Sequence, residues 1–471
     1  MRRGSERCEY LGSATERNGI IARPTLGRLA ADLAAGRTTS RALVEEALAR
    51  ISDPTGEGSR VFVKVYTDAA RAAAEAQDQL RAAGYAASPL AGLPVSIKDL
   101  FDVAGERTLA GSRALDDAPP AKADAPIVAR LKAAGAVIVG RTNMTEFAFS
   151  GVGINPHYGT PGNPFDRSLI PGGSSAGAPV SVADGMAAVA IGTDTGGSVR
   201  IPAALCGLVG FKPTQYRVPR DGATPLSTTL DSIGPIGISV ACCALTDAIM
   251  AGETADAAAP ISPDGLRLGI PQTVMLEDLE APVAAAFERA VSALSCAGVR
   301  ITELPLEMLS DYARVNIKGG LPVVEAYAWH EKLIERRGQD YDPRIGTRIA
   351  RGRDMTAAEY IRLLEARADF IRRFDAETAT FDALVMPTVP MTAPPSAAFA
   401  RDEDYARLNL KLLRNTAIIN FLDRCALSLP IEPPGTAPVG LMVVGRHGDD
   451  RRLLAIGAGI EETLASERAR Q

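Results

Sequence analysis

The chain is poor in the residues that build metal centres, redox sites and nucleic-acid surfaces. It has only three histidines in 471 residues, and its six cysteines lack C-x-x-C spacing. No group of His and Cys shows metal-ligand spacing, so we expect no metal and no other cofactor. Scattered cysteines are typical of reduced thiols in a cytoplasmic protein. A net charge of −5 without a basic cluster argues against direct binding of nucleic acid.

Long apolar runs and low-complexity segments are absent too. No stretch of about 18 apolar residues exists, so we expect no membrane span. Residues 1–24 begin with arginines and lack an apolar core, so we interpret them as an N-terminal extension rather than a secretory signal. No repeat or linker divides residues 25–471, which we expect to form a single domain.

Alternating strand and helix patterns fill the first half of that domain. The patterns predict strands at 61–66, 93–101, 136–140 and 186–194, and helices in 25–51, 67–84 and 124–135, the last capped by Asp124. This alternation favours a layered α/β fold. Residues 246–375 form a helical excursion after one strand near 266–270. A capping box, Thr356 to Glu359, starts its last long helix, and strands return at 382–390 and 437–445.

Lys98 is unusual because it lies inside the apolar segment LPVSIKDLF, residues 93–101, in a chain with few lysines. Taken alone, it is more often a lysine whose charge reaches solvent at the end of a strand. A desolvated lysine, however, has a lowered pKa and can act as a base. The charge of Asp99 would oppose that shift, but strand alternation points it to the opposite face.

Two segments rich in glycine and serine are candidates for a nucleophile. PGGSSAG, residues 171–177, fits G-x-S-x-G with Ser175 as nucleophile, but that motif needs a buried strand directly before it, and FDRSLIP is polar. In TDTGGSVRIPAALCGLVGFKPT, residues 193–214, two glycines precede Ser198. Backbone N–H groups of such a turn can stabilise an oxyanion. A Ser-His-Asp triad lacks its base, because His447 in GRHGDD is better explained as a surface-loop residue.

Together these segments identify a family resemblance. The ordered motifs are GLPVSIKDLF, GRTNMTEFAFSG, PGGSSAG, GTDTGGSVRIPAALCGLVGFKPT and GATPLSTTLDSIGP. They resemble the amidase signature family over about residues 25–465, most strongly over 92–237, with Ser174 and Ser198 at the spacing of that family. The resemblance implies an α/β amidase signature fold, in which a mixed central β-sheet is sandwiched between helical layers.

The same resemblance implies roles for individual residues. Ser198 is expected to be the acylated nucleophile, Ser174 the bridging serine in a cis peptide arrangement, and Lys98 the general base. The expected oxyanion hole consists of the backbone N–H groups of Thr195, Gly196, Gly197 and Ser198.

Three further residues are candidates for contact with the substrate. Ala148 and Ser150 match the substrate-facing segment of the family. Arg200 matches an arginine that binds a substrate carboxylate in some members, but an ion pair with Asp194 is the favoured interpretation, because buried charges are rarely unpaired. The remaining pocket walls are expected from residues 300–380 and 400–430, where Trp329, Tyr327, Tyr360 and many arginines permit an aromatic, aliphatic or acidic amide.

We therefore expect a stand-alone amidase. It would hydrolyse a small carboxamide to a carboxylate and ammonia or an amine through acyl-Ser198. The alternative is the A subunit of a tRNA-dependent amidotransferase that supplies ammonia from glutamine, but NFLDRCALSLP, residues 420–430, departs from the Gly-Leu-Pro-type loop of that protein. The substrate, the oligomeric state, including a homodimer, the need for a second protein, and the roles of Asp423 and Arg424 stay open.

Overall fold

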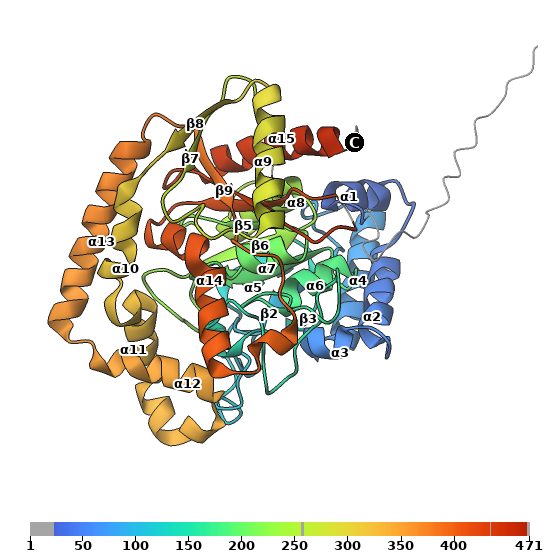
Figure 1. The fold of residues 1–471 in the computed structure, drawn as a ribbon. Coiled ribbons are helices and arrows are strands. Elements are labelled where there is room, and N and C mark those ends of the chain that lie inside the picture. Colours follow the sequence, from blue (N-terminus) through green and yellow to red (C-terminus); the bar gives the residue numbers. More distant parts are fainter. Residues whose placement is uncertain (1–22, 256–258, 434, 469–471) are drawn as a thin grey trace, which may run out of the picture.

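The computed structural model describes residues 23–255, 259–433 and 435–468. Residues 1–22 of the expected N-terminal extension therefore lie outside the described residues. Across the described parts, eleven strands form one sheet in the order β1-β3-β2-β4-β6-β5-β10-β11-β9-β7-β8 (Figure 1). The strands are β1 (Phe62–Val65), β2 (Pro94–Lys98), β3 (Val137–Thr142), β4 (Val189–Asp194), β5 (Val209–Lys212), β6 (Ser232–Gly237), β7 (Arg267–Pro271), β8 (Arg300–Leu304), β9 (Ala383–Pro387), β10 (Ala426–Pro430) and β11 (Gly440–Val444).

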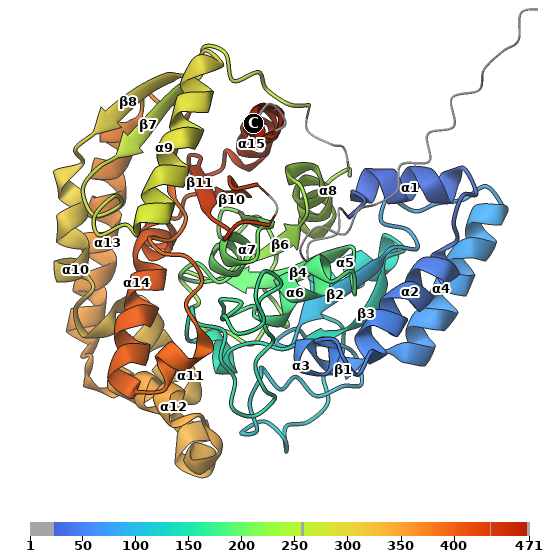
Figure 2. The same cartoon turned by 45° about the vertical axis from the view of Figure 1, so that its right-hand side comes forward.

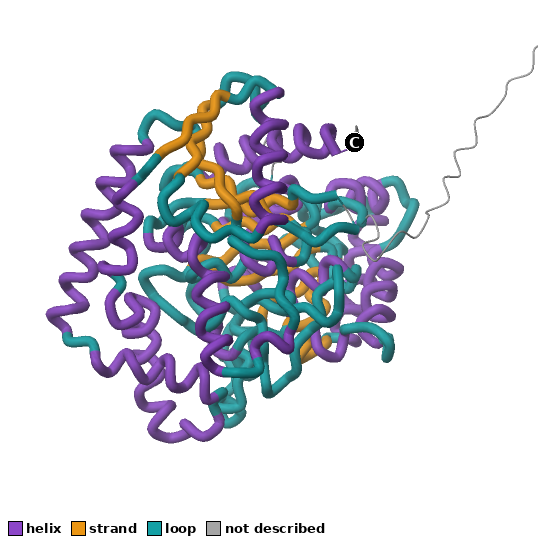
Figure 3. Tube along the Cα trace, viewed as in Figure 1, coloured by secondary structure: helices purple, strands orange, loops and turns teal. Residues whose placement is uncertain are grey.

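Helices surround the sheet on both sides. They are α1 (Leu26–Ala34), α2 (Ser40–Ser52), α3 (Gly58–Val61), α4 (Thr67–Ala82), α5 (Pro126–Ala133), α6 (Gly177–Ala183), α7 (Arg200–Leu205), α8 (Val240–Ala251), α9 (Ala281–Cys296), α10 (Asp311–Val315), α11 (Gly320–Arg337), α12 (Pro343–Ala350), α13 (Ala357–Thr378), α14 (Asp402–Phe421) and α15 (Asp450–Arg468). Figure 3 shows the strands as one band through the molecule with helices on either side.

The sheet is mixed and covered on both faces, as expected. β2 runs parallel to β3 and β4, and β7 runs parallel to β8 and β9, whereas the other pairs are antiparallel. One face packs against α1, α5, α8, α9 and α15, and the other against α2, α6, α7, α13 and α14 (Figure 2). Alternation along the strands produces a core on each face. Leu427 and Leu429 of β10 pack on the face with α8, α9 and α15, and Ala426 packs on the face with α13 and α14.

Most of the elements expected from periodicity are present, with different ends. Two helices fill residues 25–51, and the capping box from Thr356 to Glu359 is confirmed. The cap at Asp124 was wrong: α5 follows Ala125, and the Asp124 carboxylate instead accepts from the Ala104 amide and from Lys132. The strand expected over 93–101 ends at Lys98, which places that lysine at the C-terminal end of a central strand.

The helical excursion contains one strand that the sequence did not reveal. β8 lies at the edge of the sheet, where RITEL is exposed or half-buried throughout and shows no alternation of polar and apolar residues. Together β7 and β8 extend the same central sheet, and α10–α13 then form the lobe drawn in yellow-orange and orange at one end of the molecule (Figure 1). Among the described residues, no helix is long and apolar enough to cross a membrane.

Candidate active site

Lys98 is placed by the alternation of β2. Val95 and Ile97 pack into the core under α1, α5 and α8, so Ser96 faces the opposite layer, where its Oγ lies 2.9 Å from Ser181 Oγ of α6. Lys98 follows in the same phase and is fully buried. Its Nζ donates hydrogen bonds of 2.8 Å to Ser174 Oγ and of 2.8 Å to Thr193 Oγ1. The structure thus brings the expected base to the expected bridging serine.

Burial sets the charge of Lys98. Desolvation lowers the pKa of Lys98 to about 7, against the opposing charges of Asp231 and Asp194. Asp99 does not contribute, because its carboxylate turns away and accepts from Arg141 Nε at 2.8 Å and from the Gly111 amide. Strand alternation does not decide this, because β2 ends at Lys98; the contacts with Arg141 and Gly111 engage the Asp99 carboxylate instead. A substantial fraction of Lys98 is therefore neutral at neutral pH, as a general base requires.

The loop that carries Ser174 lies against the turn that carries Ser198. The Gly173–Ser174 peptide bond is cis, and the Thr145 amide donates to Ser174 O at 2.9 Å. The Ser175 amide points toward Ser198 O at 3.4 Å, so the two segments are in contact. Ser175 itself is fully buried, and its Oγ lies 3.4 Å from Thr193 O. This buried hydroxyl does not support Ser175 as the nucleophile.

The Ser198 turn is organised around the carboxylate of Asp194 at the end of β4. This carboxylate accepts from the amides of Gly197 at 2.8 Å, Val199 at 3.1 Å and Arg200 at 3.3 Å. Gly197 has a φ of 131°, a conformation that L side chains rarely adopt, and a Cβ there would lie 2.2 Å from Thr416 Oγ1. The glycine is therefore required by the turn and by the close approach of α14.

Arg200 completes this turn. Its Nη2 and Nε lie 2.9 Å and 3.0 Å from the two oxygens of Asp194, and both side chains are fully buried. Burial alone would raise the pKa of Asp194, but Arg200 brings it down to about 2. Arg200 also donates to Thr416 O and Asn420 Oδ1 of α14. The favoured ion pair with Asp194 is present, and the donors of Arg200 that a substrate carboxylate would need are engaged by Asp194, Thr416 and Asn420.

Ser198 opens into a cavity of about 340 Å³, which we call the front cavity. Its lining is mostly apolar and consists of Ala148, Phe149, Ser150, Thr195, Gly196, Ser198, Leu226, Leu230, Tyr312, Ala313, Asn316, Gly319, Pro322, Arg348, Leu410, Leu413, Arg414 and Ala417. Ala148 and Ser150 therefore lie where the sequence placed them. The walls come from residues 300–380 and 400–430 as expected, but the aromatic side chain from this region is Tyr312 rather than Trp329, Tyr327 or Tyr360.

Two residues of the front cavity are held in fixed positions by neighbours. Ser150 Oγ donates to Asn409 Oδ1 at 2.9 Å and accepts from the Tyr405 hydroxyl at 2.8 Å. Ala148 has a φ of 59°, which turns the chain sharply beside Ser198. Thr195, Gly196 and Ser198 line the same space, whereas the backbone amide of Gly197 donates to Asp194.

Arg348 of α12 is a functional candidate that the sequence did not single out. Its Nη1 donates to Phe149 O at 3.0 Å, and its guanidinium carbon lies 4.4 Å from the centre of the Phe149 ring. Burial lowers the pKa of Arg348 to about 10, and the charges acting on it come from Tyr405 and Arg351 rather than from a carboxylate. Arg414, by contrast, is engaged by Glu277 O and Asn415 Oδ1. Arg348 thus presents a cation to the front cavity.

Asp423 and Arg424, whose roles the sequence left open, support the fold. The Asp423 carboxylate accepts a hydrogen bond of 3.0 Å from the backbone amide of Gln215. Arg424 donates to Thr378 Oγ1 at 3.0 Å and forms an ion pair with Asp375 of α13. Both residues therefore attach neighbouring segments to the sheet. His447 is exposed beside Asp423, as expected for a surface loop. Nowhere in the described ranges do three His, Cys, Asp or Glu side chains gather as a metal site would require.

Comparisons with known proteins agree with this geometry. The family model described as Amidase matches residues 42–454. The 2-amino-5-chloromuconic acid deaminase of Comamonas testosteroni is 39% identical over 85% of this chain and 87% of its own. The A subunit of the glutamyl-tRNA(Gln) amidotransferase of Chloroflexus aggregans is 36% identical over 90% and 93%. A crystal structure of an amidase superimposes with a TM-score of 0.83 at 33% identity, over 93% of this chain and 99% of that one.

The chain therefore belongs to the amidase family. It is an amide hydrolase, an enzyme that acts on C–N bonds other than peptide bonds.

Proposed function

We propose that this enzyme hydrolyses carboxamides through an acyl-Ser198 intermediate, with Lys98 and Ser174 as the proton relay. The observation that carries the proposal is the hydrogen bond of 2.8 Å from Lys98 Nζ to Ser174 Oγ, behind a cavity that Ser198 lines. Ser198 Oγ attacks the carbonyl carbon, and its proton passes through Ser174 to neutral Lys98. The C–N bond then breaks, the nitrogen takes a proton from the relay, and water releases the carboxylate from Ser198.

Backbone amides supply the charge stabilisation in this proposal. Thr195, Gly196 and Ser198 border the front cavity, so their N–H groups are the donors for the oxyanion of the tetrahedral intermediate. Gly197 contributes differently, because Asp194 already accepts from its amide. Its part in the oxyanion hole is to hold the turn that carries the other three amides.

A fluorophosphonate probe tests the nucleophile directly. The probe should label the protein once, and peptide mapping should find the adduct on Ser198, because this serine reaches the cavity. Prior incubation with an excess of an intact amide that the enzyme hydrolyses should slow the labelling. An adduct on Ser175, or none on the peptide that contains Ser198, would contradict the proposed nucleophile.

We further propose that the acyl part of the substrate carries a carboxylate that Arg348 binds. A guanidinium facing a mostly apolar cavity, without a carboxylate beside it, suits an anionic group of the ligand. The relative named 2-amino-5-chloromuconic acid deaminase is, by its name, an enzyme of an acidic compound, which supports the same class. The cytoplasm remains the proposed location, on the evidence of the scattered cysteines alone.

Replacing Arg348 with leucine should raise KM for an anionic amide more than it lowers kcat. For glutaramate, the monoamide of glutaric acid, KM should rise roughly 10- to 100-fold, the usual worth of a hydrogen bond to a charged group. KM for neutral hexanamide should not rise. Arg351→Leu is the matched control: it removes the same charge from an exposed position outside the front cavity. Equal effects of the two variants on glutaramate would contradict a specific role for Arg348.

The second candidate is the A subunit of a tRNA-dependent amidotransferase. It is favoured by the relatives of that name, such as the one from Chloroflexus aggregans, which match over most of both chains. Glutamine also carries a carboxylate, so Arg348 fits either function. Ammonia release by the purified chain alone separates them: efficient turnover of simple monoamides supports the stand-alone amidase. Turnover of glutamine that appears only with the other proteins of such a complex and charged tRNA would support the alternative.

A further inference from the structure

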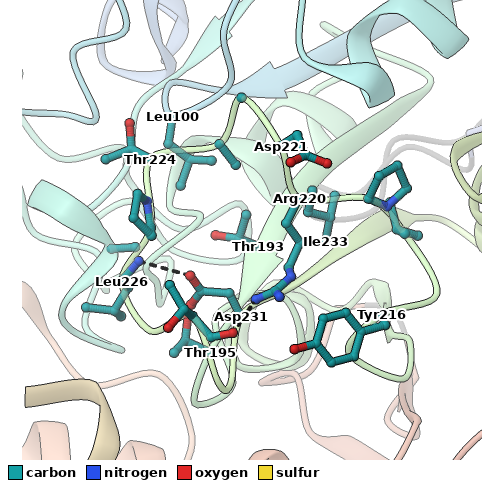
Figure 4. Close-up of a pocket in the computed structure, with 17 residues that line it drawn as sticks. Leu100, Thr193, Thr195, Tyr216, Arg220, Asp221, Thr224, Leu226, Asp231 and Ile233 are labelled. Atoms are coloured by element: carbon teal, nitrogen blue, oxygen red, sulfur yellow. Dashed lines mark hydrogen bonds between the residues drawn. The ribbon is translucent and has the colours of Figure 1, made fainter. Parts of the chain in front are cut away.

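A second cavity lies behind the Ser198 turn. This rear cavity has a volume of about 440 Å³ and is bordered by the end of β4, by the loop 216–228 and by Asp231 (Figure 4). Ala148, Thr195 and Leu226 line both cavities, so Thr195, one of the proposed oxyanion donors, lies in the wall that the two cavities share. A carbonyl carbon bound at this wall has one cavity on each side. The front cavity accommodates the acyl part of the amide, and the nitrogen part still needs a place to bind.

The rear cavity adjoins the proposed base. Thr193 lines it, and Thr193 Oγ1 is the second acceptor of Lys98 Nζ at 2.8 Å. Leu100, two residues after Lys98, lines the cavity as well. A nitrogen that leaves toward this side therefore departs next to the group that holds the proton taken from Ser198. General acid catalysis of amide cleavage needs this proximity.

The charge distribution in the rear cavity suits an amine. The Asp231 carboxylate accepts from Thr195 Oγ1 and from the amides of Leu226 and Ser227, and part of the residue stays accessible. Lys98 and Arg220 act on this carboxylate through space, but among the described residues neither forms an ion pair with it. The guanidinium of Arg220 lies over the Tyr216 ring at 4.9 Å and donates to Thr228 O, at the wall shown on the right of Figure 4. A protonated amine bound in the rear cavity would give Asp231 a direct ion pair in addition to the longer-range charges of Lys98 and Arg220.

We propose that the rear cavity is the subsite for the amine part of the substrate. It holds the nitrogen substituent during acylation, receives ammonia or a primary amine when the C–N bond breaks, and then admits the water that cleaves acyl-Ser198. The released amine takes a proton from solvent and is attracted by Asp231 as the ammonium ion. This inference rests on the proposed acyl-enzyme mechanism and adds to it that N-alkyl amides are substrates and primary amines are acyl acceptors.

The test compares amides that differ only on nitrogen. Glutaramate and N-propylglutaramate form one pair, and hexanamide and N-propylhexanamide form another. Ala223→Leu narrows the rear cavity alone, and Ala417→Leu narrows the front cavity alone. Ala223→Leu should lower the ratio of kcat/KM for the N-propyl amide to that for the unsubstituted amide by about tenfold or more, as a pocket narrowed by a few methylenes does. Ala417→Leu should leave this ratio within about twofold.

Thr224→Leu, at another point of the rear wall, is the second variant if Ala223→Leu fails to fold. Transfer of the acyl group to added propylamine, measured as N-propyl product against free acid, should fall in the same variants. An unchanged ratio and unchanged acyl transfer in a folded, active rear-wall variant would overturn the subsite while leaving the acyl-enzyme intact. A wild-type enzyme inactive on all four amides and unlabelled by the fluorophosphonate probe would instead refute the proposed function, and this inference with it.

Discussion

Ser198→Ala should lower kcat/KM for amide hydrolysis by about 10⁴-fold or more, because losing the nucleophile closes the covalent route. Ser174→Ala should cost roughly 10²- to 10⁴-fold, the usual range for assistance by proton transfer. Steady-state ammonia release gives both values, and labelling by the fluorophosphonate probe should disappear only with Ser198. The residual rate of the Ser174 variant should exceed that of the Ser198 variant.

Ser175→Ala is the matched control. Its hydroxyl is adjacent in sequence and equally buried, but the proposed relay does not pass through it, and its Oγ makes a long contact of 3.4 Å with Thr193 O. We expect this variant to lose less than about tenfold, the cost of one weak buried hydrogen bond. If the Ser174 and Ser198 variants lose equal activity, or if Ser175→Ala loses as much as either, the division of roles is wrong.

Activity should rise with pH through a single limb near the pKa of Lys98, about 7. The proposed base must be neutral, so the active fraction grows as Lys98 loses its proton, and kcat/KM should reach a plateau about two units above this pKa. Lys98→Met fills the buried space without a base. It should lower kcat/KM by roughly 10²- to 10⁴-fold and remove the limb.

The charges of two carboxylates act on Lys98 and allow a sharper control. Asp194 is held ionised by Arg200, with a pKa of about 2, so it does not titrate in this range. Burial raises the pKa of Asp231 to about 6, despite the hydrogen bonds that it accepts. The negative charge of Asp231 raises the pKa of Lys98, so Asp231→Asn should move the limb to lower pH. A limb that persists in Lys98→Met, or that does not move in Asp231→Asn, would assign the titration to another group.

The sequence predicted those helices and strands that have regular apolar periodicity and recognisable capping residues. α1 and α2 have capping threonines and regular apolar faces, and α13 begins at its capping box. β6, with the sequence SIGPIG, is buried on both faces and contains glycine and proline, so it shows neither alternation nor a strong strand composition. β8 fails for the opposite reason, because it is an exposed edge. The sheet order depends on contacts between distant segments, which periodicity does not encode.

The candidate site divides in the same way. Lys98, Ser174 and Ser198 could be predicted from the sequence because each lies in a motif that resembles those of a known family. Arg348 carries no such signal: on a short helix rich in arginine it looks like a solvated residue, and only the fold shows that it reaches the front cavity. The outcome for Arg200 depended on Thr416 and Asn420, more than 200 residues downstream, which share its guanidinium.

The attachment of the Ser198 turn to α14 constrains how this enzyme can change its substrate range. Thr416 and Asn420 hold the turn through Gly196 O and the Asp194–Arg200 pair, whereas Leu413 and Ala417, on the adjoining face of the same helix, shape the front cavity. A substitution that reshapes the cavity by shifting α14 therefore also displaces the nucleophile. Substitutions on α14 that admit a new acyl group are therefore expected to lower turnover as well. Substitutions on α12 or in the 312–322 segment can change the acyl specificity with less loss of turnover, because these segments line the front cavity without supporting the turn.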